Sequence, residues 1–185
     1  MSGSSGIARA VYHRERRYHD GMAATVLVTV EEYLHTVYRP DRDYLDGEVR
    51  ERNPGEFDHS SAQIEIGHWL RSRFRRGRVL SEQRVQVKPT RFRIPDVCVL
   101  ADDAPRESIT RTPPMLCVEI LSKDDRMSDI LERVKDYFEM GVPMCWIVDP
   151  ATRTGWTATP GNLAEATDGI LRVADLELPL AEVLP

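Results

Sequence analysis

The 185-residue sequence lacks an apolar run long enough to cross a membrane, a secretory signal and any CxxC pair of cysteines. A membrane-spanning helix needs about 20 consecutive apolar residues, and the N-terminus has no apolar segment of the kind found in signal peptides. The three cysteines, Cys98, Cys117 and Cys145, lie singly in apolar segments, which predicts buried free thiols in a reducing compartment. We therefore expect a cytoplasmic protein with no membrane partner.

An excess of positive charge is missing as well, because 25 Lys and Arg face 30 Asp and Glu, giving a formal net charge of −5. This balance argues against a generally cationic surface for nucleic acid. It leaves room for a local basic cleft, because association depends on how charge is distributed. The length and a hydrophobic content of 41% fit one globular domain. We expect a flexible leader over residues 1–24 and a single domain over residues 25–185.

The first half of the expected domain carries signals for helices and a turn. Thr29, with Glu32 three residues later, predicts the start of a short helix. The Asp-Gly pair at 46–47 predicts a hairpin turn. A longer helix is expected to start at residue 58 or 60 and to run to residue 74, with Gly77 ending it.

The second half alternates strand and helix patterns. Residues 79–88 alternate apolar and polar side chains, which predicts one antiparallel strand. A helix is expected over 125–140, where an apolar stripe ends at Gly141. A buried strand follows at 143–148. Because a strand, a helix and a strand form a right-handed crossover, this strand should run parallel to the one before the helix. Residues 153–180 are expected to form shorter hairpins.

Two strand-like segments, 93–100 and 115–121, each hold one carboxylate among apolar residues. Burying the ionised side chains of Asp96 and Glu119 is costly unless cations or strong donors compensate them. Opposite positions on paired strands lie a few ångströms apart, and magnesium is commonly held by one or two carboxylates. We expect the two carboxylates to share one Mg²⁺ or Mn²⁺, with the Ile120 carbonyl as a third ligand.

A structural explanation stays open beside the metal site. Either carboxylate could instead be a buried structural residue paired with an arginine such as Arg93, without any ion. The absence of a Cys or His cluster favours magnesium or manganese over softer metals if an ion does bind.

The Ile-Pro-Asp at 94–96, the Val-Glu-Ile-Leu at 118–121 and Lys123 resemble the PD-(D/E)xK nuclease superfamily. In that superfamily an Asp and a Glu on adjacent strands hold a divalent metal and a lysine assists. The lysine stands two residues after the Glu, a position that is Leu121 here. The resemblance therefore implies a metal-dependent nuclease whose assisting cation must come from elsewhere.

Three cations are candidates for that role. Lys123 stands just beyond the strand, and Arg133 and Lys135 lie on the following helix. A lysine can lose a proton or orient a water, whereas an arginine does little beyond holding phosphate. Lys123 is therefore the first choice, and a solvated loop lysine is the alternative reading.

Within that superfamily the chain resembles the bacterial Uma-two-type family of restriction-endonuclease-like proteins. The resemblance covers about residues 25–175 and rests on the segments 44–48, 58–60, 93–97, 118–122, 129–137, 141–143 and 146–150. It implies an α/β fold with a mixed sheet flanked by helices and extra antiparallel hairpins. It also implies a magnesium-dependent nuclease site and a homodimer. The helix lysine of such proteins falls where this chain has Arg133.

Further residues are candidates for the same site. Glu48 matches the family's Asp-Gly-Glu and is expected to be a third acid, unless it is a solvated hairpin residue. His59 should face inward from its helix start, where a neutral imidazole can hydrogen-bond a carboxylate or a metal-bound water, unless its role is purely structural. The cations expected to contact phosphate, in addition to Arg133, are Arg84, Lys88, Arg91 and Arg93.

The sequence thus supports a nuclease acting on nucleic acid, with DNA expected rather than RNA. Two alternatives stay open. One is a catalytically degenerate nuclease-fold module for binding or assembly, which the leucine at position 121 favours. The other is a metal-assisted hydrolase of a phosphorylated small molecule.

Overall fold

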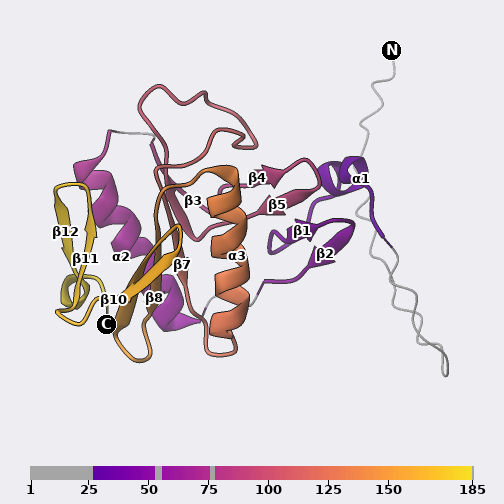
Figure 1. The fold of residues 1–185 in the computed structure, drawn as a ribbon. Coiled ribbons are helices and arrows are strands. Elements are labelled where there is room, and N and C mark those ends of the chain that lie inside the picture. The colour runs from indigo at the N-terminus through magenta and orange to yellow at the C-terminus, as the bar shows by residue number, and fades with distance from the viewer. Residues whose placement is uncertain (1–26, 53–55, 76–77, 185) are drawn as a thin grey trace, which may run out of the picture.

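The computed structural model describes residues 27–52, 56–75 and 78–184 (Figure 1). The expected leader, residues 1–24, and the expected helix stop Gly77 lie outside these ranges. The helices are α1 (Val30–His35), α2 (Phe57–Arg73), α3 (Met127–Met140) and the 3-10 turn η1 (Leu180–Glu182). The strands are β1 (Asp43–Leu45), β2 (Glu48–Arg50), β3 (Val79–Ser81), β4 (Val85–Lys88), β5 (Arg91–Arg93), β6 (Val97–Val99), β7 (Leu116–Ile120), β8 (Cys145–Asp149), β9 (Thr154–Thr159), β10 (Asn162–Glu165), β11 (Ile170–Val173) and β12 (Leu176–Pro179). Within the described ranges, no helix is both long and apolar enough to span a bilayer.

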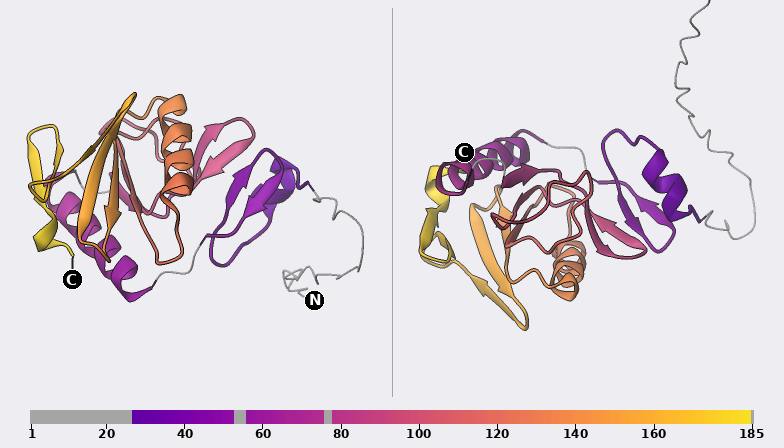
Figure 2. Two further views of the ribbon diagram at one scale, coloured as in Figure 1. Left: turned by 60° about the horizontal axis from the view of Figure 1, so that its bottom comes forward. Right: turned by 90° about the horizontal axis from the view of Figure 1, so that it is seen from above.

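A six-stranded mixed sheet forms the centre of the molecule, in the order β10-β9-β8-β7-β6-β3. β7 and β8 are parallel, as the crossover predicts, and the other neighbours are antiparallel. Figure 2 shows α2 and α3 on opposite faces of this sheet. The expected mixed sheet flanked by helices is confirmed.

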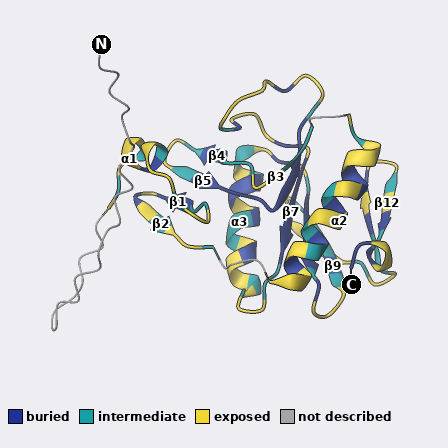
Figure 3. Cartoon of the chain, turned by 180° about the vertical axis from the view of Figure 1, so that it is seen from behind, coloured by how far each residue is buried: buried dark blue, intermediate teal, exposed yellow. Residues whose placement is uncertain are grey.

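Two apolar layers hold the helices to the sheet. On one face α2 packs Ala62, Ile66 and Leu70 against β6, β7 and β8, and the β11–β12 hairpin completes this layer. On the other face the apolar stripe of α3, which includes Ile130 and Val134, packs against the same strands. Every residue of β7 is buried (Figure 3). An acidic residue in β7 is therefore removed from bulk water whichever face it points to.

A second, four-stranded sheet, β2-β1-β5-β4, lies beside the first (Figure 1). α1 covers it with Tyr33, which packs against Tyr44 and Phe92. The capping box expected at the start of α1 is present, since Thr29 and Glu32 bond each other's backbone N–H. The expected Asp-Gly turn joins β1 and β2, with positive φ at both residues.

Two expected strands are each divided between the two sheets. Residues 79–88 form β3 in the six-stranded sheet and β4 in the other, because Glu82 adopts φ +50° between them. Residues 93–100 are interrupted at 94–96, where Pro95 has no N–H to donate to a ladder. The interruption separates β5 from β6 and places Asp96 at the junction of the two sheets.

Other boundaries differ from expectation by one to three residues. α2 begins at Phe57 and α3 at Met127, each preceded by a residue without a side-chain cap. Gly141 ends α3 in the left-handed conformation, as expected. The hairpins β9–β10 and β11–β12 confirm the expected C-terminal pattern. All three cysteines are buried and free, and burial raises the pKa of the Cys98 thiol to about 12.

Candidate active site

Asp96 and Glu119 lie at one end of the β6–β7 ladder. Val97 pairs with Val118 in the antiparallel register, so the next step along the ladder sets Asp96 opposite Glu119. Both side chains are buried, with residue exposures of 1% and 0%. The register therefore produces the pair of neighbouring buried carboxylates that the sequence predicts.

Three groups contact the Asp96 carboxylate, and a fourth contacts its backbone carbonyl. Arg52 Nη2 lies 2.6 Å from Oδ1, and the Ile120 backbone N–H donates to Oδ2 at 2.7 Å. His59 Nε2 lies 3.4 Å from Oδ2, and Gln63 donates to the Asp96 carbonyl at 3.0 Å. Burial raises the pKa of Asp96, but the contacts with His59, Arg52 and Ile120 outweigh it and leave the pKa below its usual value. Asp96 is therefore held in its ionised form.

The contact with Asp96 that lowers the pKa of the carboxyl raises the pKa of His59. Burial lowers the pKa of its imidazole, but the hydrogen bond and the charge of Asp96 outweigh burial and leave the pKa raised. His59 and Gln63 lie one turn apart on α2, which explains why both reach Asp96. The inward direction expected for His59 is confirmed.

Glu119 has different partners, both from α3. The Tyr137 hydroxyl donates to Oε1 at 2.6 Å, and Arg133 Nη1 lies 2.9 Å from Oε2. Burial raises the pKa of Glu119; Arg133 lowers it, the neighbouring charge of Asp96 raises it further, and the result is a raised pKa. The pKa of Asp96 is thus lowered and that of Glu119 raised, although the two carboxyls share one site.

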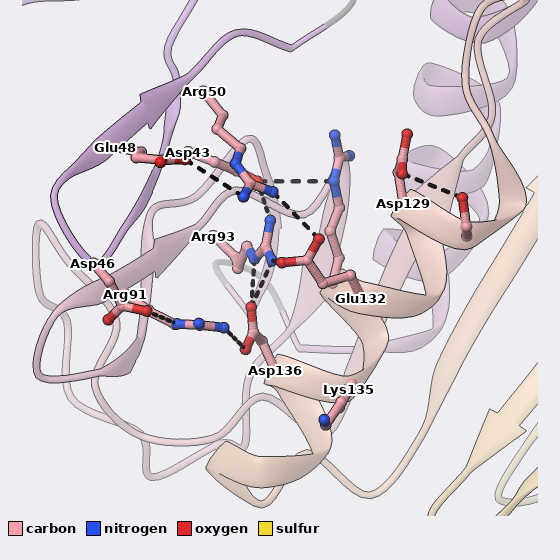
Figure 4. A network of polar contacts seen from close by, with 12 residues as sticks. Asp43, Asp46, Glu48, Arg50, Arg91, Arg93, Asp129, Glu132, Lys135 and Asp136 are labelled. Carbon is pink, nitrogen blue, oxygen red and sulfur yellow. Dashed lines mark hydrogen bonds and ion pairs between the residues drawn. The ribbon is translucent and has the colours of Figure 1, made fainter. Parts of the chain in front are cut away.

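A buried ion-pair network is centred on Arg93 (Figure 4). Arg93 bonds Asp43 at 2.9 Å, Asp136 through Nε at 2.7 Å and Glu132 at 3.2 Å. Arg133 Nε also lies 3.8 Å from Asp43, so the network continues to Glu119. The network joins α3 to β1 and β5 and fixes where Arg133 points.

The structure differs from two expectations about Arg93. It was expected to contact phosphate, but its side chain is only 3% exposed and its donors are directed at three carboxylates. It was also the arginine offered as a structural partner for Asp96 or Glu119. That structural role falls to Arg52 and Arg133 instead.

The other cations expected on phosphate are also paired with acids. Arg84 lies 2.6 Å from Asp41, and Lys88 pairs with Glu139. Arg91 joins Asp46 and Asp136, at 2.5 and 3.0 Å. In the described structure Lys88 and Arg91 join the four-stranded sheet to α3, and Arg84 binds the segment before β1, so none of the three is paired with Asp96 or Glu119.

Three remaining candidates lie on the surface. Glu48 is exposed on β2 and pairs with Arg50 at 3.6 Å (Figure 4). Lys123 is exposed in the turn between β7 and α3. Lys135 is exposed on α3, 3.9 Å from Glu139. Of the candidates, the structure brings His59 and Arg133 onto Asp96 and Glu119.

Sequence reasoning missed Arg52, Tyr137 and Asp43. Tyr137 stands four residues after Arg133, and this spacing puts both side chains on one face of a helix. That signal was available. Arg52 and Asp43 stand among alternating charged residues near the hairpin, where nothing in the sequence distinguishes a buried ion from an exposed one.

The oxygen atoms at the site are suitable ligands for a divalent ion, although the charge of the two carboxylates is already balanced by arginines. Two carboxylates and the Ile120 carbonyl are the oxygen ligands that Mg²⁺ and Mn²⁺ prefer. Each ionised carboxylate has about four acceptor positions, so the contacts described above leave positions open. Among the described residues there is no cluster of three or more His, Cys, Asp or Glu suited to a metal. Arg52 and Arg133 instead neutralise the pair, so an ion would compete with guanidinium.

Comparisons with known proteins give consistent results. A family model described as "Uma2: Putative restriction endonuclease" matches residues 30–179. The crystal structure of "a putative nuclease belonging to DUF820" from Anabaena variabilis superposes with a TM-score of 0.74 at 22% identity, covering 84% of this chain and 97% of that one. A search of curated proteins found no match. The structural likeness, at this identity, concerns the fold.

Proposed function

Because the chain belongs to the Uma2 family of restriction-endonuclease-like proteins, we propose that it is a nuclease that hydrolyses phosphodiester bonds in DNA with Mg²⁺ or Mn²⁺. The observation that carries the proposal is the buried pair Asp96 and Glu119, set opposite each other at the end of β6 and β7. A divalent ion bound there would stabilise charge on the phosphoryl oxygens and supply a nucleophilic water.

The residues around the pair take distinct roles. Asp96, Glu119 and the Ile120 carbonyl would hold the ion, and His59 orients the Asp96 carboxylate from α2. Tyr137 fixes Glu119 from α3. The imidazole of His59 is only 10% exposed, so it contacts Asp96 from the buried side of the carboxylate.

Lys123 and Arg133 divide the role of the missing strand lysine. Arg133 is held by Glu119 and Asp43, so its guanidinium has a fixed position beside the carboxylates. It cannot exchange a proton near neutral pH. Lys123 is exposed at the carboxyl end of β7, where an ammonium group can turn toward a bound phosphate or water. We assign proton transfer to Lys123 and positioning to Arg133.

Calorimetric titration tests the metal site directly. Wild type should bind one Mn²⁺, and the double variant Asp96→Ala, Glu119→Ala should bind none. Cleavage of duplex DNA, assayed beside single-stranded DNA and RNA, should require the ion and disappear in Asp96→Ala. Equal binding by both proteins, or binding by neither, would contradict the proposal.

Single-turnover rates test the cations. Lys123→Ala should slow cleavage by ~10²-fold, as expected for loss of one acid–base or electrostatic contributor, and should leave Mn²⁺ affinity nearly intact. Lys123→Arg restores the rate only if charge alone is needed. If Lys123→Ala cleaves like wild type while Arg133→Ala or Lys135→Ala is inactive, the role belongs to α3.

A second candidate function is a nuclease-fold module that binds without turnover. Two observations favour it: Leu121 fills the lysine position, and arginines neutralise both carboxylates. DNA binding without cleavage, under conditions in which wild type binds Mn²⁺, would establish this function. A homodimer is expected under either function, and analytical ultracentrifugation tests it.

A further inference from the structure

Arg52 and Arg133 hold the carboxylate pair in unequal ways. Arg133 extends from the middle of α3 and has two acids, Glu119 at 2.9 Å and Asp43 at 3.8 Å. Arg52 follows the end of β2 and has one buried acid, Asp96 at 2.6 Å. Its second acid, Glu82, is 3.7 Å away and 57% exposed. Arg52 is therefore the guanidinium that is held by fewer buried partners.

The Arg52 side chain is also incompletely satisfied. It is only 10% exposed, and its Nε has no hydrogen-bond partner in the described structure. An unpaired buried donor destabilises the arrangement that contains it. A change that moves this guanidinium toward new acceptors would remove that cost.

Arg52 is linked through Glu82 to a groove on the neighbouring surface. A groove of about 490 Å³ between α2 and β3 is lined by residues including Gln63, Glu82 and Val97. Gln63 donates to the Asp96 carbonyl, and Glu82 is the second acid of Arg52. Arg71 lines the same groove and offers a cation to an anionic chain. Gln63 and Glu82 therefore connect the groove to Asp96 and Arg52, and Arg71 places a cation on its wall.

We propose that Arg52 occupies Asp96 in place of the divalent ion, is displaced when the ion binds, and then holds a phosphate of the nucleic acid in the α2–β3 groove. The inference rests on the proposed function, because it takes the Asp96–Glu119 pair as the metal site. On this view Arg52 sets how strongly the site binds its ion and couples that binding to the substrate.

Competition of this kind has a measurable consequence. Suppose the ion binds only to molecules in which Arg52 has already left Asp96. The apparent affinity is then the intrinsic affinity multiplied by the fraction of such molecules. A ligand that gives Arg52 another partner raises that fraction. Nucleic acid should therefore strengthen metal binding, and the coupling should be reciprocal.

Mn²⁺ affinity of wild type and Arg52→Gln, measured by calorimetry, tests the competition. Arg52→Gln should bind Mn²⁺ about tenfold more tightly, which corresponds to an Arg52–Asp96 pair that is closed about nine-tenths of the time. The matched control is Arg84→Gln, because Arg84 also lies 2.6 Å from a carboxylate and also has an unpartnered buried Nε. Its Mn²⁺ affinity should equal that of wild type.

The second arm repeats the titrations with a cleavage-resistant phosphorothioate oligonucleotide. The oligonucleotide should tighten Mn²⁺ binding by wild type and by Arg84→Gln, and it should do so less for Arg52→Gln, in which only direct contact between phosphate and ion remains. If Arg52→Gln binds Mn²⁺ no more tightly than wild type, or shows the same coupling as wild type, the inference is wrong while the proposed nuclease site stands. If neither wild type nor Arg52→Gln binds Mn²⁺, the metal site itself is wrong and the inference fails with it.

A measurement on wild type covers the case in which Arg52→Gln does not fold. The Nε–H resonance of Arg52, assigned by its loss in Arg52→Lys, should shift on titration with Mg²⁺. The corresponding Arg84 resonance should stay in place. An Arg52 resonance that remains unchanged at saturating Mg²⁺ would overturn the displacement.

Discussion

At the scale of single residues, the two buried carboxyls share one site but have different surroundings. Asp96 meets a backbone N–H, an imidazole and a guanidinium, which outweigh burial and keep its pKa low. Glu119 meets one guanidinium and one phenol, and burial dominates, so its pKa is raised. Neighbouring carboxyls with separated pKa values take different roles. We expect Asp96 to stay ionised and the charge of Glu119 to lower stability.

Glu119→Gln tests that expectation without metal. A carboxyl with a higher pKa in the folded state binds more protons when folded, so stability falls as pH rises from its unfolded value, near 4.5, through its folded value. Melting temperatures in chelator should therefore be higher for Glu119→Gln than for wild type at neutral pH, with a smaller difference near pH 4.5. Mn²⁺ affinity should be lost. A lower melting temperature at neutral pH would instead show that the Arg133–Glu119 pair contributes net stability.

Arg93 is expected to matter for stability rather than for binding. Arg93→Met leaves Asp43 and Asp136 buried with reduced compensation, and breaking a buried ion pair in this way costs about 3 kcal/mol or more. Urea denaturation should show this loss. Arg172→Met is the control, because Arg172 pairs with Asp168 and Glu177 on the surface, and it should leave the denaturation midpoint almost unchanged. Equal effects of both variants would contradict the structural role of Arg93.

The sequence could predict part of this site for physical reasons. An acid inside an apolar strand stands out by its cost, so Asp96 and Glu119 were identifiable. His59 was identifiable because helical spacing fixes its direction. Arg52 and Asp43 were not, because a charged residue beside a hairpin is usually solvated and only long-range packing buries these two.

At the scale of secondary-structure elements, helix and turn signals predicted better than strand signals. The α1 cap and the end of α3 depend on neighbours in sequence, which a sequence pattern contains. Residues 79–88 alternate like one strand, yet the positive φ of Glu82 divides them between two sheets. Which sheet accepts β3 or β4 depends on distant strands, so the local pattern could not decide it.

Two glycines should respond in opposite ways to the same substitution. Gly141 ends α3 at φ +105°, a conformation that costs an alanine about 1 kcal/mol or more. Gly67 lies within α2, and an added Cβ there meets no atom within 4 Å. Gly67→Ala should stabilise by about 0.5–1 kcal/mol because alanine restricts the unfolded chain and favours helix. Chemical denaturation of both variants measures the difference, and two changes of the same sign would contradict it.

At the scale of the whole molecule, α3 connects the two sheets. Its apolar stripe packs on the six-stranded sheet, and its acids Glu132 and Asp136 bind Arg93 of β5 (Figure 4). The chain also passes directly from β5 into β6 through Asp96. The sequence predicted the mixed sheet and the helices, but not the second sheet, because its strands are short and the β1–β5 pair that joins its two halves sets Tyr44 opposite the distant Phe92.

These connections predict one cooperative unfolding transition for residues 25–185. A ligand that binds only the folded protein stabilises it by about 2.7 kcal/mol at a free concentration 100 times its Kd. That stabilisation should raise the melting temperature by about 5–10 °C for a chain of this size. Scanning calorimetry with Mn²⁺ should shift the entire transition of wild type and leave Asp96→Ala, Glu119→Ala unshifted. A second transition whose temperature does not change with Mn²⁺ would show that the four-stranded sheet unfolds separately. The ion-pair network around Arg93 would then not couple this sheet to the metal site.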